Sequence, residues 1–546
     1  MFCGKKVFFR FISGPTGQFA GGESQGGNGV GEAGAVHLHL QREASGLISN
    51  GPKLFRRVKG SPFRGLGNAQ RPRFGIMDVG PFPYRMFHCV QVYLAVTAGD
   101  EEELGAVGEK FRSAALVRFQ MVSVYRFSVT SHQSPVTGDR SPVTAFRRFI
   151  MRITPAIELE YRCSRMQLAM GAAGLDAVLV VQNADLFYFT GSVQAGCLYI
   201  PVQGQPLYLV RRDAGRARME SGLKEVLPFS SPRELPRIIA EYGYPSPRRV
   251  GLELDVLPVN LCYRYQAPFT GVVWLDASPL IRKLRMIKSS YEIHIMMDAG
   301  GQVDKLFRRV PEIVREGMTD LMLSAELEYV ARTQGHPGFV RMRSFNGELG
   351  VGHVYSGTDS AVPTYTDTPL GGMGLSPSFG QGASYRAICR NEPIVVDFSG
   401  SFDGYLVDQT RIFALGPVSP RLQRAYDDML ALQELMKDTV QVGVGWGEIY
   451  DACRALATAQ GHGDGFMGIP GSQVHFVGHG VGIEIDEYPL LARRFGGVPL
   501  EVGMAFAFEP KVVFPGEGAV GIENTFYLSG EGLKQLTVSD ERLMIL

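Results

Sequence analysis

Apolar and polar residues recur at two different spacings beyond residue 156, and the change of spacing predicts where helices and strands lie. Over the first part of this region one helical pattern is followed by short apolar runs that glycine, proline and polar residues separate. Such runs are typical of strands and of a compact α/β domain. The predicted elements are a helix over 158–173, strands over 177–181, 250–254 and 272–275, and a hairpin over 197–210, in a domain that covers 151–285.

The remaining chain, 286–546, alternates long helical patterns with strand-like runs that favour antiparallel pairing. The apolar stripes of the helices are interpreted as core faces, because their spacing matches one side of a helix. Helices combined with antiparallel strands predict an α+β domain whose sheet is curved. The predicted helices cover 290–314, 320–333, 421–437 and 447–459.

The first 150 residues differ from the rest in both pattern and composition. Residues 1–80 contain eleven Lys or Arg against four Asp or Glu, with clustered glycines and no sustained periodicity, so disorder is the expectation. A transit peptide is an alternative, but the acidic run 100–103 argues against it. A third hypothesis, which we prefer, is a reading frame that truly starts at Met151, because an amphipathic helix follows at once.

Composition limits the classes of function. The chain has 546 residues, 45% of them apolar, and a net charge of +1, so nucleic acid and acidic polymers are not expected partners. Apolar runs of membrane-spanning length are not seen, so no membrane partner is expected. Seven cysteines lie scattered without a Cys-x-x-Cys pair, which favours a reducing compartment and a cytoplasmic location.

The most informative chemistry lies in two aspartates eleven residues apart, Asp397 and Asp408. Each follows an apolar, β-branched run, and Gly400 and Gly404 lie between them, a pattern that predicts a hairpin. Antiparallel pairing would bring the two carboxylates to one patch of the sheet. Because paired buried anions are unfavourable without a cation, and carboxylate oxygens suit divalent metals, the pair predicts a metal site.

Three downstream residues strengthen this interpretation. His479 stands between Gly478 and Gly480, and histidine is the commonest metal ligand. Glu509 and Glu523 each end an apolar, strand-like run. A lone glutamate in such a place is more often a surface residue, but two of them after the histidine and the aspartate pair make chance less plausible.

The five candidate ligands and their flanking residues resemble the ligand set of the pita-bread metallopeptidases (family M24). The ligands are Asp397, Asp408, His479, Glu509 and Glu523, and the flanking motifs are Asp408-Gln409-Thr410-Arg411, Gly478-His479-Gly480-Val481-Gly482 and Phe508-Glu509-Pro510. The upstream Gly174-Leu175-Asp176-Ala177 and Tyr188-Phe189-Thr190-Gly191 resemble the branch that contains aminopeptidase P, prolidase and creatinase. The resemblance covers roughly 151–546 and implies a C-terminal pita-bread domain preceded by a smaller creatinase-type domain.

The resemblance implies two divalent metal ions, with manganese favoured and cobalt, zinc or iron possible. Asp397 would bind one metal, His479 and Glu509 the other, and Asp408 and Glu523 both. A hydroxide between the metals would be the nucleophile, and Glu509 would shuttle its proton to the leaving nitrogen. The implied activity is removal of the N-terminal residue from short Xaa-Pro peptides, by a homodimer.

The sequence departs from the family at two histidines that contact substrate. Asp486 stands where a family histidine is expected, and residues 378–386 contain no histidine. His475 matches another substrate-side histidine and is predicted to lie in the pocket and take part in catalysis, while His353 could replace a missing donor from a loop. Thr410 and Arg411 could orient the metal ligands, although Arg411 could equally form a structural ion pair.

These departures leave two alternatives open beside the peptidase. The first is a creatinase-like hydrolase of a small substrate with a C–N bond, in which Asp486 would bind a cationic group. The second is a metal-binding homologue without catalytic activity.

Overall fold

The computed structural model describes residues 7–10, 74–77, 93–96, 115–118 and 152–546, and divides the chain into two compact units, 1–144 and 145–546. The first unit has two antiparallel strand pairs, β1 with β2 and β3 with β4. Their bounds are Val7–Arg10, Phe74–Met77, Tyr93–Val96 and Ala115–Arg118. Met151 lies outside the described residues, as do all of residues 1–150 apart from these four strands, so the expectations for that segment stay predictions.

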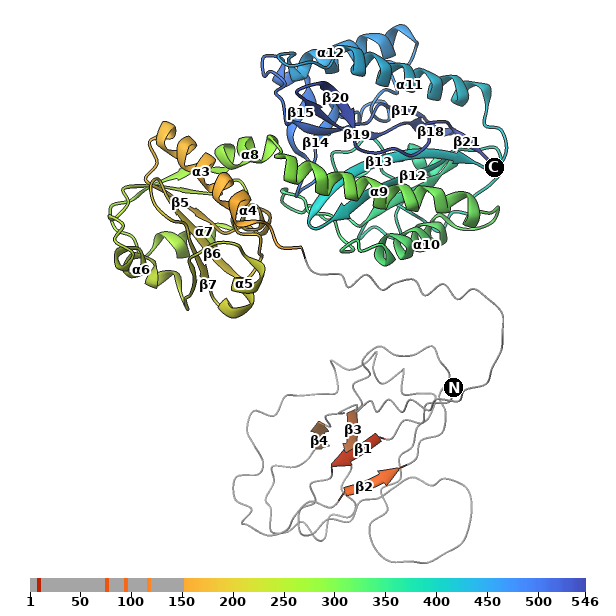
Figure 1. The fold of residues 1–546 in the computed structure, drawn as a ribbon. Helices are drawn as coiled ribbons and strands as arrows, with labels where there is room; N and C mark the ends of the chain where they lie inside the picture. Colours follow the sequence, from red (N-terminus) through yellow and green to blue (C-terminus); the bar gives the residue numbers. More distant parts are fainter. Residues whose placement is uncertain (1–6, 11–73, 78–92, 97–114, 119–151) are drawn as a thin grey trace, which may run out of the picture. The chain divides into compact units, whose positions relative to one another are not determined.

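The second unit begins with a smaller domain built on one mixed sheet of six strands, in the order β10-β9-β5-β6-β7-β8 (Figure 1). The helix predicted over 158–173 agrees closely with α3 at the start of this domain. Gly174 caps the end of α3, because glycine adopts its φ of +65° without strain. The elements are α3 Ala156–Ala173, β5 Ala177–Val180, α4 Asn183–Thr190, β6 Gly196–Pro201, β7 Leu207–Val210, α5 Ala214–Glu220, β8 Val226–Pro228, α6 Leu235–Glu241, β9 Arg249–Leu252, α7 Val259–Gln266, β10 Val273–Asp276 and α8 Ser278–Met286.

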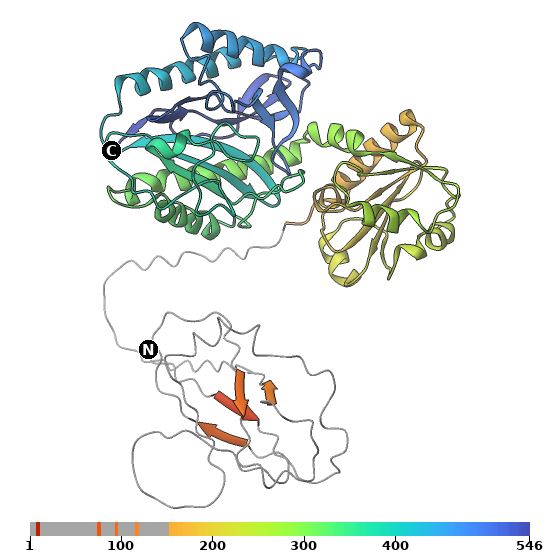
Figure 2. The ribbon, with the colours of Figure 1, turned by 180° about the vertical axis from the view of Figure 1, so that it is seen from behind.

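The larger domain follows from Ser290 and consists of two main sheets with helices on their outer faces. The four-stranded sheet has the order β11-β12-β13-β21 and the five-stranded sheet the order β15-β14-β16-β19-β20. Helices α9 and α10 pack on the first of these sheets, while α11 and α12 pack against β18 and β15 (Figures 1 and 2). The predicted α+β class is therefore confirmed.

The helices of the larger domain are α9 Ser290–Ile313, α10 Asp320–Thr333, α11 Pro420–Thr439 and α12 Trp446–Ala459. Helix α9 begins with a capping box between Ser289 and Glu292. The strands are β11 Gly352–Ser356, β12 Ile394–Phe402, β13 Tyr405–Ala414, β14 Phe476–Gly480, β15 Glu487–Ala492, β16 Ala505–Phe508, β17 Lys511–Phe514, β18 Gly518–Gly521, β19 Asn524–Ser529, β20 Gly532–Gln535 and β21 Met544–Ile545.

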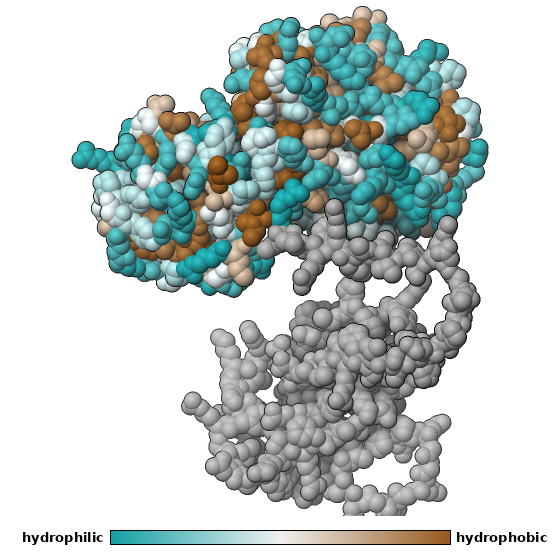
Figure 3. Space-filling model, in the orientation of Figure 1, coloured by the Kyte–Doolittle hydropathy of each residue, from teal (hydrophilic) through white to brown (hydrophobic). Residues whose placement is uncertain are grey.

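The surface of the described residues mixes polar and apolar side chains. Figure 3 shows hydrophilic and hydrophobic residues interspersed on the face in view. Among the described residues, every helix is too short or too polar to cross a lipid bilayer. The cysteines of residues 152–546 are all free thiols, and the compartment stays a prediction.

Candidate metal centre

The predicted hairpin is present and places both aspartates on one face of the sheet. Strands β12 and β13 pair antiparallel, with Asp397 opposite Thr410 and Ser399 opposite Asp408. Since residues two positions apart on a strand share a face, the two carboxylates lie on the same side. The turn consists of Asp403 and Gly404, with φ of 43° and 85°, the Asp-Gly combination that favours a two-residue hairpin turn.

The other three predicted ligands reach the same place through the second sheet. His479 lies on β14, opposite Ala507 of β16, and Glu509 follows directly after β16. Glu523 precedes β19 and forms a bridge with Thr410 of β13. This bridge joins β13 of the first sheet to the segment that precedes β19 of the second, so ligands more than a hundred residues apart in sequence line one cavity.

The glycines beside His479 have a packing role. A Cβ at Gly478 would lie 2.5 Å from the carbonyl oxygen of Ala507, and one at Gly480 would lie 2.2 Å from that of Tyr488. Both distances are too short for a side chain. The glycines therefore allow close approach of neighbouring backbone to the histidine strand, as expected for glycine at such positions.

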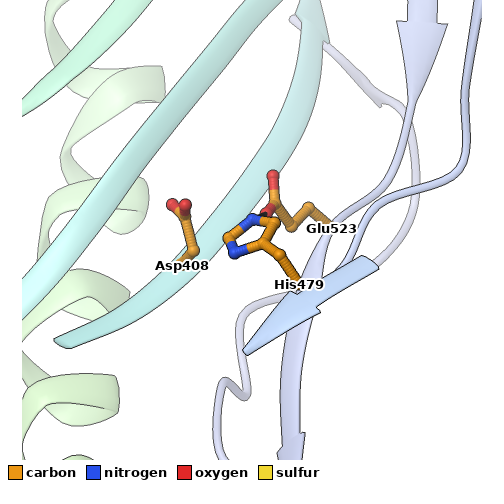
Figure 4. Close-up of side chains that lie close together, drawn as sticks. All are labelled: Asp408, His479 and Glu523. Atoms are coloured by element: carbon orange, nitrogen blue, oxygen red, sulfur yellow. Dashed lines mark ion pairs between the residues drawn. The ribbon is translucent and has the colours of Figure 1, made fainter. Parts of the chain in front are cut away.

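A cavity of about 590 Å³ contains all five predicted ligands in its wall. Three of them, Asp408, His479 and Glu523, offer atoms that lie within 4.8 Å of one another, and their side chains converge (Figure 4). The Oε1 atom of Glu523 is buried and has no hydrogen-bond partner among the described residues. A buried carboxylate oxygen without a partner is unfavourable, so this donor set fits a divalent metal ion.

Lys511, which the sequence analysis did not single out, lies among the remaining carboxylates. Its Nζ donates to Oε2 of Glu509 at 2.7 Å and to Oε2 of Glu523 at 2.9 Å, and lies 3.4 Å from Oδ2 of Asp397. The lysine side chain is 1% exposed. Asp408, His479 and Glu523 thus lie close enough together to hold a metal ion. The ammonium group of Lys511 contacts Asp397, Glu509 and also Glu523.

The charges of the cavity shift the protonation of its members. Burial raises the pKa of Asp408 well above its usual value, and the neighbouring Glu523 and Asp397 raise it further. Burial alone would lower the pKa of Lys511, but Asp397, Glu509 and Glu523 hold it well above its usual value. Both shifts show that this group of carboxylates favours a positive charge in its midst.

Two polar residues of β13 support the ligands. Thr410 Oγ1 donates to Oε2 of Glu523 at 2.7 Å, so it is placed to orient that carboxylate. The Arg411 guanidinium donates to the carbonyl oxygens of Glu523 and Thr410 at 2.8 Å each, and also to Asn524 Oδ1. Arg411 therefore holds the backbone that carries Glu523, which is a structural role distinct from an ion pair.

Asp486 lines the cavity beside His479. One carboxylate oxygen lies 3.5 Å from Nδ1 of His479, and the aspartate side chain is 47% exposed. On the other side of the ring, Nε2 lies 3.6 Å from Oε1 of Glu509 and 3.8 Å from Oε1 of Glu523. A carboxylate beside the outer nitrogen favours the tautomer in which Nε2 is free to bind a metal.

The two other histidines end up in different places. His353 lines the cavity from strand β11, where it is paired with Asp397, and its Nε2 lies 3.1 Å from Nε2 of Gln381. It therefore comes from a strand and not from the expected loop. His475 is exposed and is absent from the described cavity wall, so its predicted place in the pocket is wrong in this structure. It precedes β14, whose pairing is irregular between Phe476 and His479.

Comparisons with known proteins agree with the fold. The model for "Metallopeptidase family M24" matches residues 294–529, and the model for "Creatinase/Prolidase N-terminal domain" matches residues 162–287. A protein described as "Uncharacterized peptidase YqhT" from Bacillus subtilis is 25% identical over 389 residues, which is 70% of this chain and 100% of that protein. The Xaa-Pro dipeptidase of Pyrococcus furiosus is 25% identical over 390 residues, 71% of this chain and 100% of that protein.

Solved structures show the same similarity. An Xaa-Pro dipeptidase from Bacillus anthracis has a TM-score of 0.60 at 28% identity and covers 71% of this chain and 100% of that chain. An X-Pro aminopeptidase from Thermotoga maritima has a TM-score of 0.59 at 22% identity, with 70% of this chain and 99% of that chain covered, which shows the fold.

Proposed function

Because the chain belongs to metallopeptidase family M24 and carries its creatinase/prolidase N-terminal domain, we propose that it removes the N-terminal residue from short peptides whose second residue is proline. The observation that carries the proposal is the convergence of Asp408, His479 and Glu523 in the wall of a cavity of about 590 Å³. A site of this size accommodates a small peptide. Proteins that align with this chain over their whole length include Xaa-Pro dipeptidases.

Asp408, His479 and Glu523 would hold a divalent metal ion, and Glu509 lies beside them. The ion would supply Lewis acidity and would lower the pKa of a water molecule in the cavity. Glu509 has one carboxylate oxygen bonded to Lys511, while its Oε1 faces His479 at 3.6 Å. We assign the proton transfer to the leaving nitrogen to this second oxygen.

The cavity wall offers groups that suit the two ends of a small peptide. Arg282 and Arg494 line it together with the carboxylate of Asp486. Arginine side chains suit a peptide carboxylate, because their planar donors match its two oxygens. Asp486 suits a peptide ammonium. His353 is the imidazole placed to donate to the substrate where the family histidines are absent.

The resemblance to the family also leads us to propose manganese, cobalt, zinc or iron as the metal, and a homodimer as the assembly. The cytoplasm fits the scattered free cysteines. Size-exclusion chromatography with light scattering tests the assembly, and metal analysis of the protein purified from its source tests the metal.

The test is hydrolysis of a panel of Xaa-Pro dipeptides and tripeptides by the full chain, stripped of metal and then supplied with manganese, cobalt or zinc. Cleavage that the metal restores, and that Asp408→Asn abolishes, would support the proposal. Asp464→Asn is the matched control, because Asp464 is exposed. Silence on every peptide, with metal bound, would overturn it and favour a small substrate with another C–N bond, or a binding role.

A second variant separates these alternatives. Asp486→His restores the side chain that the family has at this position, next to His479. A large gain in Xaa-Pro cleavage would show that the cavity is otherwise that of a peptidase. An unchanged rate, with metal still bound, would favour the creatinase-like hydrolase or the homologue without catalysis.

A further inference from the structure

We propose that the ammonium group of Lys511 takes the place of one metal ion, so that this chain holds a single divalent ion together with a cation of its own. This inference rests on the proposed function in one respect, the binding of metal by the same carboxylates. It goes beyond the family resemblance, which implies two metal ions.

The first support is the geometry around Nζ of Lys511. Its polar contacts are carboxylate oxygens of three predicted ligands, Asp397, Glu509 and Glu523, at 3.4, 2.7 and 2.9 Å. Metal ions bind carboxylate oxygens at about 2.0–2.2 Å, and an ammonium at hydrogen-bond distance from the same oxygens fills the space that an ion would need. Because the lysine side chain is 1% exposed, it is enclosed in this position.

The second support is the way in which the two glutamates divide their oxygens. Oε2 of Glu523 accepts hydrogen bonds from Lys511 and Thr410, and its Oε1 is buried without a hydrogen-bond partner among the described residues. Glu509 gives Oε2 to Lys511, while its Oε1 faces Nε2 of His479. One oxygen of each glutamate therefore serves the ammonium, and the other faces the histidine side, where Asp408 also lies.

The third support is the space that the sheet reserves for the lysine. In the β17–β18 ladder Lys511 lies directly opposite Gly521. A Cβ at Gly521 would lie 2.6 Å from Cγ of Lys511 and 2.5 Å from the carbonyl oxygen of Pro510. The absence of a side chain at Gly521 thus makes room for the stem of Lys511 on its way to the carboxylates.

The experiment counts metal ions in the full chain after stripping with a chelator and titration with Mn²⁺. We expect calorimetry and elemental analysis to give one ion per chain, and electron paramagnetic resonance at saturation to show an isolated ion without exchange coupling. Two ions in the unaltered chain, or none, would overturn the inference. One ion bound without peptide cleavage would overturn the proposed function and leave this inference standing.

Two substitutions sharpen the test. Lys511→Met removes the charge and keeps an unbranched side chain, so we expect the number of bound ions to rise from one to two, with a coupled spectrum. Lys511→Arg retains a cation and is expected to stay at one. A folded Lys511→Met chain that still binds one ion would overturn the replacement. If Lys511→Met fails to fold, the spectrum of the unaltered chain decides alone.

Discussion

Two groups of buried charged side chains in the second unit of the chain differ in how their charges are paired, one at the metal centre and one where the smaller domain meets the larger. At this domain junction Arg285 of α8 donates to Asp185 at 2.6 Å and to Glu484 at 2.7 Å, and it also pairs with Glu487. Lys288 donates to Glu487 at 2.9 Å. Each carboxylate of this group has a cationic partner.

Two more residues complete the charge balance of the junction. Arg343 of the larger domain donates to Asp185 at 2.7 Å and bonds to Asp255 as well. Glu253 is fully buried, and burial together with the neighbouring Asp185 raises its pKa well above the usual value. Three cations, Arg285, Arg343 and Lys288, thus face three buried carboxylates, Asp185, Glu484 and Glu487.

The metal centre differs because its charges are not balanced by the protein. Asp397, Asp408, Glu509 and Glu523 are four carboxylates, and among the described residues Lys511 is a cation that contacts three of them, Asp397, Glu509 and Glu523. One oxygen of Glu523 is left without a partner among the described residues. The comparison teaches that a buried charge group with complete pairing joins two domains, whereas one with a surplus of one sign is arranged for a ligand.

The largest expected effect comes from removing a carboxylate at the metal centre, where the carboxylates outnumber the cations. Glu523→Gln takes away a metal ligand and a partner of Lys511, so metal affinity should fall by more than the roughly 100-fold typical for the loss of an outer partner. Isothermal titration of the stripped chain with Mn²⁺ measures this. Unchanged affinity would mean that the ion binds elsewhere, and Asp464→Asn serves as control.

At the domain junction, where cations and carboxylates are paired, the loss of a charged side chain should lower the stability of the fold. Arg285→Met leaves three buried carboxylates without their shared partner, and breaking a buried pair in this way costs about 3–5 kcal/mol of unfolding free energy. Urea unfolding monitors it, and the number of metal ions bound should not change. A loss within about 0.5 kcal/mol, as expected for the exposed Arg237→Met, would contradict the structural role.

Acid should reduce the stability that the ion pairs of the domain junction give to the fold. Burial would raise the pKa of Glu487, but Arg285 and Lys288 lower it to about 2. A carboxyl with a depressed pKa stabilises the fold above its ordinary pKa and loses this effect as the pH falls toward the folded value. The difference in stability between the unaltered chain and Glu487→Gln should be roughly 3 kcal/mol above pH 5 and should shrink between pH 4.5 and 2. Urea midpoints across this range measure it, and a constant difference would contradict it.

A milder change at the metal centre tests the orientation of a ligand. Thr410→Val removes the hydrogen bond to Oε2 of Glu523, and the loss of such a partner lowers metal affinity about 10–100-fold. Thr458→Val is the control, because its hydroxyl bonds only to its own helix. Equal affinities in the two variants would show that Lys511 alone is sufficient to hold Glu523.

The smallest effect is expected at Asp486. Its contact with Nδ1 of His479 is long, at 3.5 Å, and its side chain is half exposed. Asp486→Asn should therefore lower metal affinity by at most about tenfold, the lower end for partners of metal ligands. A loss as large as that of Glu523→Gln would mean that Asp486 binds the metal directly.

The sequence predicted the fold class and the cavity wall well, because both rest on local patterns. The pita-bread fold with its creatinase-type domain is confirmed by the family matches and by the solved structures. All five predicted ligands line the cavity, since each ends an apolar run or stands between glycines. His475, predicted from its match to a family histidine, precedes β14, which begins at Phe476, and is absent from the described cavity wall, so its catalytic role stays a prediction.

Lys511 was missed although a signal was present. It stands two residues after Glu509 at the start of an apolar strand, where a lysine is rarely buried without a partner. The need of a buried lysine for an anionic partner would have indicated the nearby predicted ligands, Asp397, Glu509 and Glu523. The junction between Asp185, Arg285 and Glu484 had no such signal, because its members are separated by 100 and 199 positions and meet only through tertiary packing.

The enclosed lysine has a consequence for how the protein matures. Metal sites are usually incomplete until the cell delivers the ion, and folding then depends on metal supply. Here Asp397, Glu509 and Glu523 already contact a cation that arrives with the polypeptide itself. On the proposed arrangement we therefore expect the strands that carry them to fold before any metal ion binds.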